Sequence, residues 1–243
     1  PDKRPRPLVL RVNEGDCLEV VFANLLSPET NGQEIVKDPA NGRDVPIDSE
    51  EPETRHASMH VNGLELVGGI QADGSNVGRN PSSLAAPGET RIYEWYARKE
   101  GGYLLYSMAA PAGGEGDGGQ LGLGLFGSVN VEPKGSSWYR SQVTAGQLMA
   151  AEDEKPNPYG TPKIHYAATD QYGQPILAIL NRQDEIVHSD LNAVIDATSQ
   201  DCHDITGPSS SCGMPFREFT AIFHDEVTAE QAWEEWVLYI LTG

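Results

Sequence analysis

Apolar and polar residues alternate along short stretches of the first 133 residues, with the period of a half-buried β-strand. The alternating stretches are residues 8–12, 17–22, 57–61, 90–97, 102–107 and 126–131. In the fourth of them, Tyr93 and Trp95 share one face, whereas Ile92 and Tyr96 share the other. Turn residues separate the stretches, so the pattern predicts an all-β Greek-key β-sandwich over residues 1–133.

Two segments within this region break the strand pattern. Residues 27–55 are polar, acidic and proline-bearing, which predicts a long surface excursion with little structure of its own. Residues 110–123 contain a glycine-rich run with Glu115 and Asp117, which predicts a flexible loop at one end of the sandwich. The two acids could hold a cation weakly, but such a loop is a poor place to fix catalytic carboxylates.

After Pro133 the alternation stops, and residues 134–216 are interpreted as an irregular connector. Within it, residues 142–154 could hold a short helix and residues 166–180 a hairpin. Residues 217–226 alternate again and end in an acidic pair.

The chain has 36 acidic and 17 basic residues and a formal net charge of −19. This charge argues against binding to nucleic acid, whose phosphates require a basic surface. It favours cations or a basic partner nearby, but the preferred interpretation is a charged surface that keeps a secreted or salt-exposed protein in solution. No apolar run approaches the roughly 20 residues of a membrane span, so none is expected. The first residues carry no secretory leader, as expected of a processed start or a shortened chain.

The three cysteines are interpreted separately. Cys202 and Cys212 enclose a loop rich in glycine, proline and serine, a natural span for one disulfide, which favours an exported protein. Cys17 lies in an alternating strand pattern and is expected to be a buried apolar side chain rather than a reactive thiol.

Several motifs in the first 133 residues belong together. They are Ser58-Met59-His60-Val61-Asn62-Gly63, Asp73-Gly74-Ser75-Asn76, Gly102-Tyr103-Leu104-Leu105-Tyr106-Ser107-Met108, Gly119-Gln120 and Gly124-Leu125-Phe126-Gly127-Ser128-Val129. This series resembles the first domain of multicopper oxidases, above all the large ceruloplasmin-like and bacterial manganese-oxidase-like ones. That family has His-x-His-Gly on one strand, Trp-Tyr-His-Ser-His on a later strand, then Gln and Gly-Leu-Tyr-Gly. The resemblance implies a cupredoxin-like fold and covers residues 7–133.

Most of the copper ligands of that family are replaced in this chain. His60 matches the first of four domain-one histidines, while Asn62, Tyr106 and Met108 stand in place of the other three. Copper requires imidazole or thiolate ligands, so a phenol and a thioether cannot hold a cluster that reduces dioxygen. His60 is a candidate metal ligand, and the alternative is a hydrogen-bonded strand histidine.

Two further sites were considered in the second half. Asp201-Cys202-His203, with Met214 downstream, is similar to part of a blue-copper motif, but a disulfide-closed loop explains the same residues. His224 and Glu226 could converge on a metal, because alternate strand residues share a face; the alternative is a strand entering an acidic turn.

Gly122-Leu123-Gly124-Leu125-Phe126-Gly127 matches the spacing of a dinucleotide-binding motif. That motif needs a helix after the glycines, and here an alternating strand pattern follows. The nucleotide interpretation is therefore rejected.

Taken together, the resemblance implies the N-terminal part of a secreted oxidoreductase, extracellular or periplasmic, with copper in the full-length protein. Other cupredoxin domains of the same protein would be its partners and would supply the copper sites; metal cations are further candidate partners. This segment would be scaffold, without catalytic residues of its own, and residues 217–243 would open a second, incomplete cupredoxin-like domain. The alternative is a metal-free binding or structural module at the cell surface. His-x-His and His-Cys-His motifs downstream of Gly243 would favour the oxidase.

Overall fold

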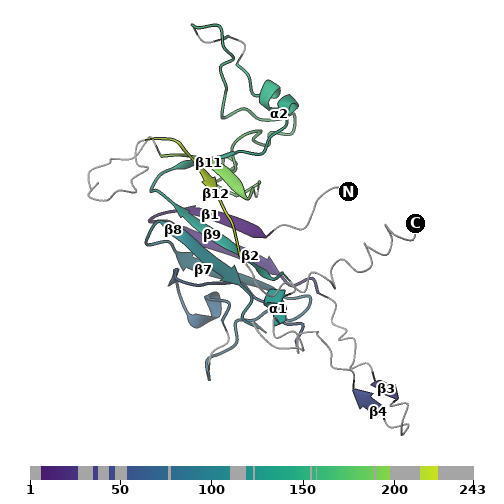
Figure 1. The fold of residues 1–243 in the computed structure, drawn as a ribbon. Coiled ribbons are helices and arrows are strands. Elements are labelled where there is room, and N and C mark those ends of the chain that lie inside the picture. Colours follow the sequence, from purple (N-terminus) through teal and green to yellow (C-terminus); the bar gives the residue numbers. More distant parts are fainter. Residues whose placement is uncertain are drawn as a thin grey trace. The chain divides into compact units, whose positions relative to one another are not determined.

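The computed structural model describes eleven parts of the chain and is nearly all β (Figure 1). The described residues are 7–26, 35–37, 44–46, 54–75, 78–109, 119–122, 124–153, 155–156, 158–188, 190–197 and 214–223. The prediction of an all-β fold is confirmed. Among these residues, no helix combines the length and the apolar composition needed to cross a bilayer.

The strands of the described residues form four hydrogen-bonded sheets. The largest has the order β1 (Leu8–Asn13), β9 (Phe126–Glu132), β8 (Gly101–Tyr106), β5 (His60–Val61). Two three-stranded sheets have the orders β2 (Cys17–Ala23), β7 (Thr90–Tyr96), β6 (Glu65–Leu66), and β10 (Ser137–Arg140), β11 (Asn192–Asp196), β12 (Phe216–Phe219). A hairpin joins β3 (Ile35–Lys37) to β4 (Asp44–Pro46), and the helices are η1 (Ile70–Ala72), α1 (Gly119–Gly122) and α2 (Ala145–Ala150).

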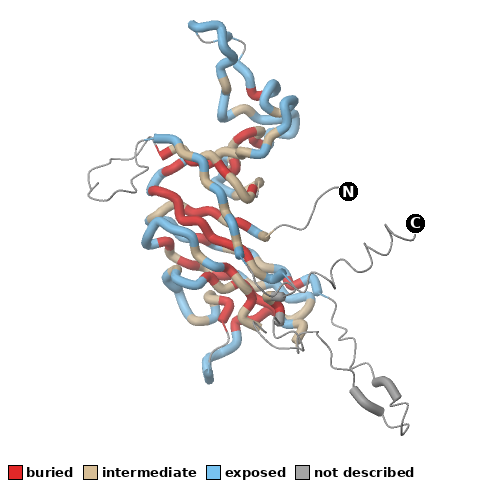
Figure 2. Tube along the Cα trace, viewed as in Figure 1, coloured by how far each residue is buried: buried red, intermediate tan, exposed pale blue. Residues whose placement is uncertain are grey.

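The chain divides into two compact units, each assembled from separate segments. The first comprises Pro1–Asp16, Lys99–Gly102 and Asn130–Ala221, and the second comprises Cys17–Arg98, Tyr103–Val129 and Ile222–Gly243. Within β9, which has a hydrogen-bonded strand on each side, every residue from Gly127 to Glu132 is buried, as expected where both faces of a sheet are covered (Figure 2).

The core of the second unit is built around two aromatic residues of β7. Tyr93 and Trp95 are fully buried with ring centroids 5.9 Å apart, and their antiparallel partners on β2 are Val20 and Leu18. The Tyr93 hydroxyl donates to the Ser83 carbonyl at 2.7 Å, and burial raises the pKa of this phenol to about 12. The expected division of this strand into two faces is confirmed, because Ile92 on the other face is exposed.

The first unit has its own apolar core, which sequence reasoning did not predict. It consists of Trp138, Ile179, Ala193 and Ile195, with three partly buried residues packed against it, Leu180, Ile186 and Phe216. The antiparallel strands β10, β11 and β12 form its sheet. Strand β12 overlaps the predicted alternating stretch of residues 217–226, whereas β10 and β11, with four and five residues, carry too short an alternation to be recognised in the sequence. The predicted connector, residues 134–216, therefore contains two strands of this sheet and its core.

Other local predictions were tested by the structure. The expected helix within 142–154 is α2, where a capping box joins Thr144 and Gln147, and the expected hairpin pairs Thr169 with Pro175. The segment 27–55 was expected to have little structure but contains the β3–β4 hairpin.

The prediction for Cys17 was wrong, because its thiol is exposed. Alternation along β2 buries Leu18 and therefore turns its neighbour outward.

Candidate functional site

The candidate site of the second unit lies where β5 pairs with β8. His60 and Tyr106 are direct partners in this antiparallel pair. Their rings contact edge to face, with centroids 5.6 Å apart and planes at 87°. Residues opposite one another have neighbouring side chains on one face of a sheet, so a phenol occupies the space beside the imidazole.

A carboxylate also contacts the imidazole of His60, at its Nδ1 atom. The Nδ1 atom of His60 lies 3.2 Å from both Oδ2 and the backbone carbonyl of Asp73. Oδ1 of the same carboxylate accepts a hydrogen bond from the buried Trp95 indole at 3.3 Å. Asp73 thereby ties the half-buried His60 to the core, and a carboxylate on one ring nitrogen sets the orientation of an imidazole.

The turn after Asp73 permits this approach. Gly74 has φ +73°, and a Cβ atom there would lie 1.8 Å from the backbone oxygen of Met59. Only glycine fits such a position, because the chain passes directly against the strand that carries His60. The Asp-Gly sequence therefore shapes the site.

The other two positions of the copper motif lie beyond the ends of the strands. Asn62 is exposed in the turn after β5, where its backbone N–H donates to the Leu104 carbonyl at 2.9 Å. Met108 follows the end of β8, and its backbone N–H donates to Ser58 Oγ at 3.0 Å. Strand pairing thus joins only His60 and Tyr106 directly.

A buried polar network that sequence reasoning missed supports the ends of these strands. The Ser107 hydroxyl donates to Gln120 Oε1, and Gln120 Nε2 donates to the carbonyls of His56 at 2.7 Å and Thr54 at 3.3 Å. Both Ser107 and Gln120 are buried. The Gly119-Gln120 motif was the available signal, and the side chain of this glutamine ties α1 to residues 54–56.

The residues at this site do not fit a multinuclear copper centre. Within the described parts of the chain, no three His, Cys, Asp or Glu side chains come close enough together to hold a metal ion. Around His60 the neighbours are a phenol and a carboxylate that already engages Nδ1. A multinuclear copper centre needs several imidazoles, so the donor set does not match.

The remaining sequence predictions on metal sites stay predictions. Glu115, Asp117, Cys202, Cys212, His203, His224 and Glu226 lie outside the described residues. Met214 is described and exposed. The strand expected after the glycine motif of residues 122–127 is β9, which follows α1 without a further helix.

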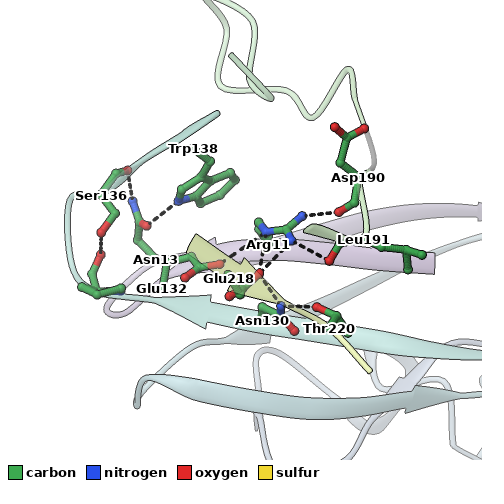
Figure 3. Close-up of polar contacts among 11 residues, drawn as sticks. Arg11, Asn13, Asn130, Glu132, Ser136, Trp138, Asp190, Leu191, Glu218 and Thr220 are labelled. Atoms are coloured by element: carbon green, nitrogen blue, oxygen red, sulfur yellow. Dashed lines mark hydrogen bonds and ion pairs between the residues drawn. The ribbon is translucent and has the colours of Figure 1, made fainter. Parts of the chain in front are cut away.

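The first unit contains a second polar centre, built around the buried guanidinium of Arg11 on β1 (Figure 3). Its Nε and Nη2 donate to Glu218 Oε1 on β12, at 3.1 and 2.7 Å. Nη1 and Nη2 donate to the carbonyls of Asp190 and Leu191, at 2.8 and 3.3 Å. Arg11 thus holds β12 and the segment leading into β11.

Two residues of β9 complete this centre. Asn130 Nδ2 donates to Glu218 Oε1 at 2.7 Å and to Thr220 Oγ1 at 2.8 Å. Glu132 is buried with its Oε1 3.4 Å from Arg11 Nε, and this oxygen has no hydrogen-bond partner. Burial and the neighbouring Glu218 carboxylate raise the pKa of Glu132 to about 9. We call Arg11, Asn130, Glu132 and Glu218 the arginine cluster.

No protein-family model matches the chain. A curated relative is the "Probable nitrite reductase-hydroxylamine oxidoreductase fusion protein" of Kuenenia stuttgartiensis, which is 33% identical over 128 residues, or 52% of this chain. This chain spans only 11% of that protein.

Similar solved structures include a multi-copper oxidase from Pseudomonas thermotolerans and Lac15 from a marine microbial metagenome. The first has a TM-score of 0.33 and 23% identity, covering 52% of this chain and 22% of that chain. The second has a TM-score of 0.32 and 18% identity, covering 51% of this chain and 23% of that chain.

Proposed function

We propose that this chain is a scaffold part of a larger, exported oxidoreductase of the multicopper-oxidase type, whose copper centres are built by other domains. The observation that carries the proposal is the pairing of His60 with Tyr106. The strand frame of a copper-binding domain is retained there, while the facing position holds a side chain that packs instead of binding metal.

The chemistry of the site supports a structural role for His60. Its imidazole contacts an aromatic ring on one side and a carboxylate on the other, and that carboxylate is bonded to a core indole. These contacts hold the loop of Asp73 against β5. A histidine with this surrounding stabilises the fold whether or not copper is present in the rest of the protein.

The curated relative is consistent with a chain that is one domain of a larger, multi-domain protein. By its name it is a fusion of two redox enzymes, and the matched region is a small fraction of its length. We propose that this chain likewise belongs to a multi-domain redox protein. Its net charge of −19 would draw cationic substrates, such as metal ions, toward that protein.

Copper loading tests the scaffold role. The purified chain is incubated with copper, desalted and analysed for metal, beside a variant that restores the family's histidines, N62H/Y106H/M108H. We expect no tightly held copper in the wild type and a gain in the restored variant, because imidazoles then replace the non-binding side chains. One or more coppers retained by the wild type, and lost in His60→Ala, would overturn the scaffold assignment.

A further inference from the structure

The arginine cluster places two carboxyl groups beside one guanidinium in the interior of the first unit. We propose that Glu132 and Glu218 share a single proton, and that this proton makes the attachment of strand β12 to Arg11 and Asn130 depend on pH. The inference concerns this unit alone and does not depend on the proposed oxidase scaffold.

The balance of charge is the first argument. The Arg11 side chain is 1% exposed and that of Glu132 is 3% exposed, whereas that of Glu218 is 18% exposed. One guanidinium can neutralise one carboxylate. If Glu132 were ionised as well as Glu218, its buried charge would be uncompensated, and such a group takes up a proton instead.

The contacts identify which carboxyl group is ionised. Glu218 Oε1 accepts three hydrogen bonds, two from Arg11 and one from Asn130. An oxygen that accepts several donors, one of them cationic, is stabilised as a carboxylate. Glu132 Oε1 accepts none and is 3.4 Å from the guanidinium, so Glu132 is the group that carries the proton.

The other charged groups around the cluster do not change this assignment. Glu100 adds negative charge near Glu132 and makes a small contribution to the raised pKa of Glu132. The pKa of Glu100 is itself raised by burial and then by Glu14. Asp190 is the remaining acid, and its carboxylate is paired with Arg140 at 3.4 Å. Thr220, the residue after β12, contributes only a neutral hydroxyl. Arg217, the neighbour of Glu218 on β12, is exposed and belongs to the opposite face of the strand.

Proton linkage gives the direction of the effect. While β12 is attached, Glu132 holds its proton up to about pH 9; when β12 leaves, Glu132 loses both its burial and its acidic neighbour and ionises in the ordinary range of glutamate. Opening therefore releases one proton at intermediate pH. The opening equilibrium rises about tenfold per pH unit across this window and levels off above it.

The consequence is a strand held firmly in mildly acidic or neutral medium and loosened in alkaline medium. The sequence predicts that residues 217–243, which include most of β12, open a further domain. The cluster would thus set how firmly the chain entering that domain is held to the first unit.

Hydrogen exchange of the amides of residues 216–219 tests the proposal on the 243-residue chain. Exchange is measured from pH 6 to pH 9 and corrected for the intrinsic pH dependence of amide exchange. In the wild type we expect protection to fall about tenfold per pH unit. In Glu132→Gln, an isostere of the protonated acid, protection should not depend on pH. In Glu218→Gln it should be low throughout, and the exposed Glu19→Gln should match the wild type.

The infrared band of a protonated carboxyl group gives a second measurement. It uses only the wild type and Glu132→Gln, so it does not depend on whether Glu218→Gln folds. We expect this band at neutral pH in the wild type and its loss in Glu132→Gln. Protection in the wild type that is independent of pH would overturn the proposal. So would an open β12 in Glu132→Gln, or a carboxyl band that persists in that variant.

Discussion

The ring of Tyr106 lies edge-on against the imidazole of His60, directly across the antiparallel pair of β5 and β8, with centroids 5.6 Å apart. Two positions that bind metal in the multicopper-oxidase motif are thus in packing contact with each other. The contact closes the space beside the imidazole, while Asp73 engages the far side of the ring. The contact between these two side chains stabilises the fold.

Removing the Tyr106 ring should therefore destabilise the second unit. Aromatic pairs of this geometry contribute about 0.5–1.5 kcal/mol beyond the area they bury. We expect Tyr106→Leu to lower the free energy of unfolding in urea by at least that amount. Tyr106→Phe keeps the ring and is the matched control, so it should differ little from the wild type. Equal losses in both variants would assign the effect to the hydroxyl instead.

The glycine after Asp73 should be far more sensitive than glycines in similar backbone conformations elsewhere. Gly74 and Gly88 both have positive φ, at +73° and +83°, but only Gly74 faces a nearby backbone atom. Gly88→Ala should cost roughly 1–2 kcal/mol from left-handed strain alone. Gly74→Ala adds a clash with the Met59 carbonyl and should cost clearly more, measured by thermal unfolding. Similar costs for the two variants would contradict the close approach.

The sequence predicted the second unit better than the first, because alternation along β7 and the motifs around His60 are local signals. Tyr93 and Trp95 were placed on one face, and the structure buries them. Neither Asp73 nor Gln120 could be assigned a partner, because their contacts join residues far apart in the chain. The expectation that Cys17 is buried was wrong. On an alternating strand the burial of Leu18 places its neighbour Cys17 on the exposed face.

The arginine cluster escaped prediction for a different physical reason. Arg11, Asn130 and Glu132 are polar residues on alternating strands, and polar residues in such strands are ordinarily on the solvent side. Here they are buried because β12 places Glu218 against them, 88 residues after Asn130 and 207 residues after Arg11. A short strand after a long connector gives no local signal of that contact.

Removal of the Arg11 guanidinium should be strongly destabilising. Arg11→Met leaves Glu218 and Glu132 without a cation in a buried position, and breaking a buried ion pair on one side costs about 3–5 kcal/mol. Urea unfolding measures the loss. Arg98→Met is the control, since its pair with Glu65 is at the surface and should contribute little. A loss for Arg11→Met no larger than that for Arg98→Met would show that the cluster does not stabilise the unit.

The thiol of Cys17 should react with a maleimide in the folded protein, since it is exposed at the start of β2. We expect labelling within minutes without denaturant, and Cys17→Ser should abolish labelling at this site. The same substitution should change the melting temperature little, because surface changes usually alter stability by less than about 0.5 kcal/mol. Peptide mapping locates the label. A thiol that reacts only after unfolding would restore the original expectation of a buried side chain.

The stability of the whole chain should decline as pH rises through neutrality. Glu132 has a folded pKa of about 9, raised first by burial and then by Glu218, so its protonated form is the one that fits the fold. A group with a raised pKa contributes its stability fully below its unfolded pKa and loses it as pH rises through the folded value. The free energy of unfolding in urea should therefore fall between about pH 5 and pH 9. Glu132→Gln should flatten this fall and be more stable than the wild type at pH 8.

Above pH 10 both proteins should lose further stability, because the buried Tyr93 has its pKa raised to about 12 and ionises on unfolding. Tyr93→Phe separates that alkaline loss from the one due to Glu132. A wild type whose stability is constant from pH 5 to pH 9 would show that Glu132 is ionised in the folded protein.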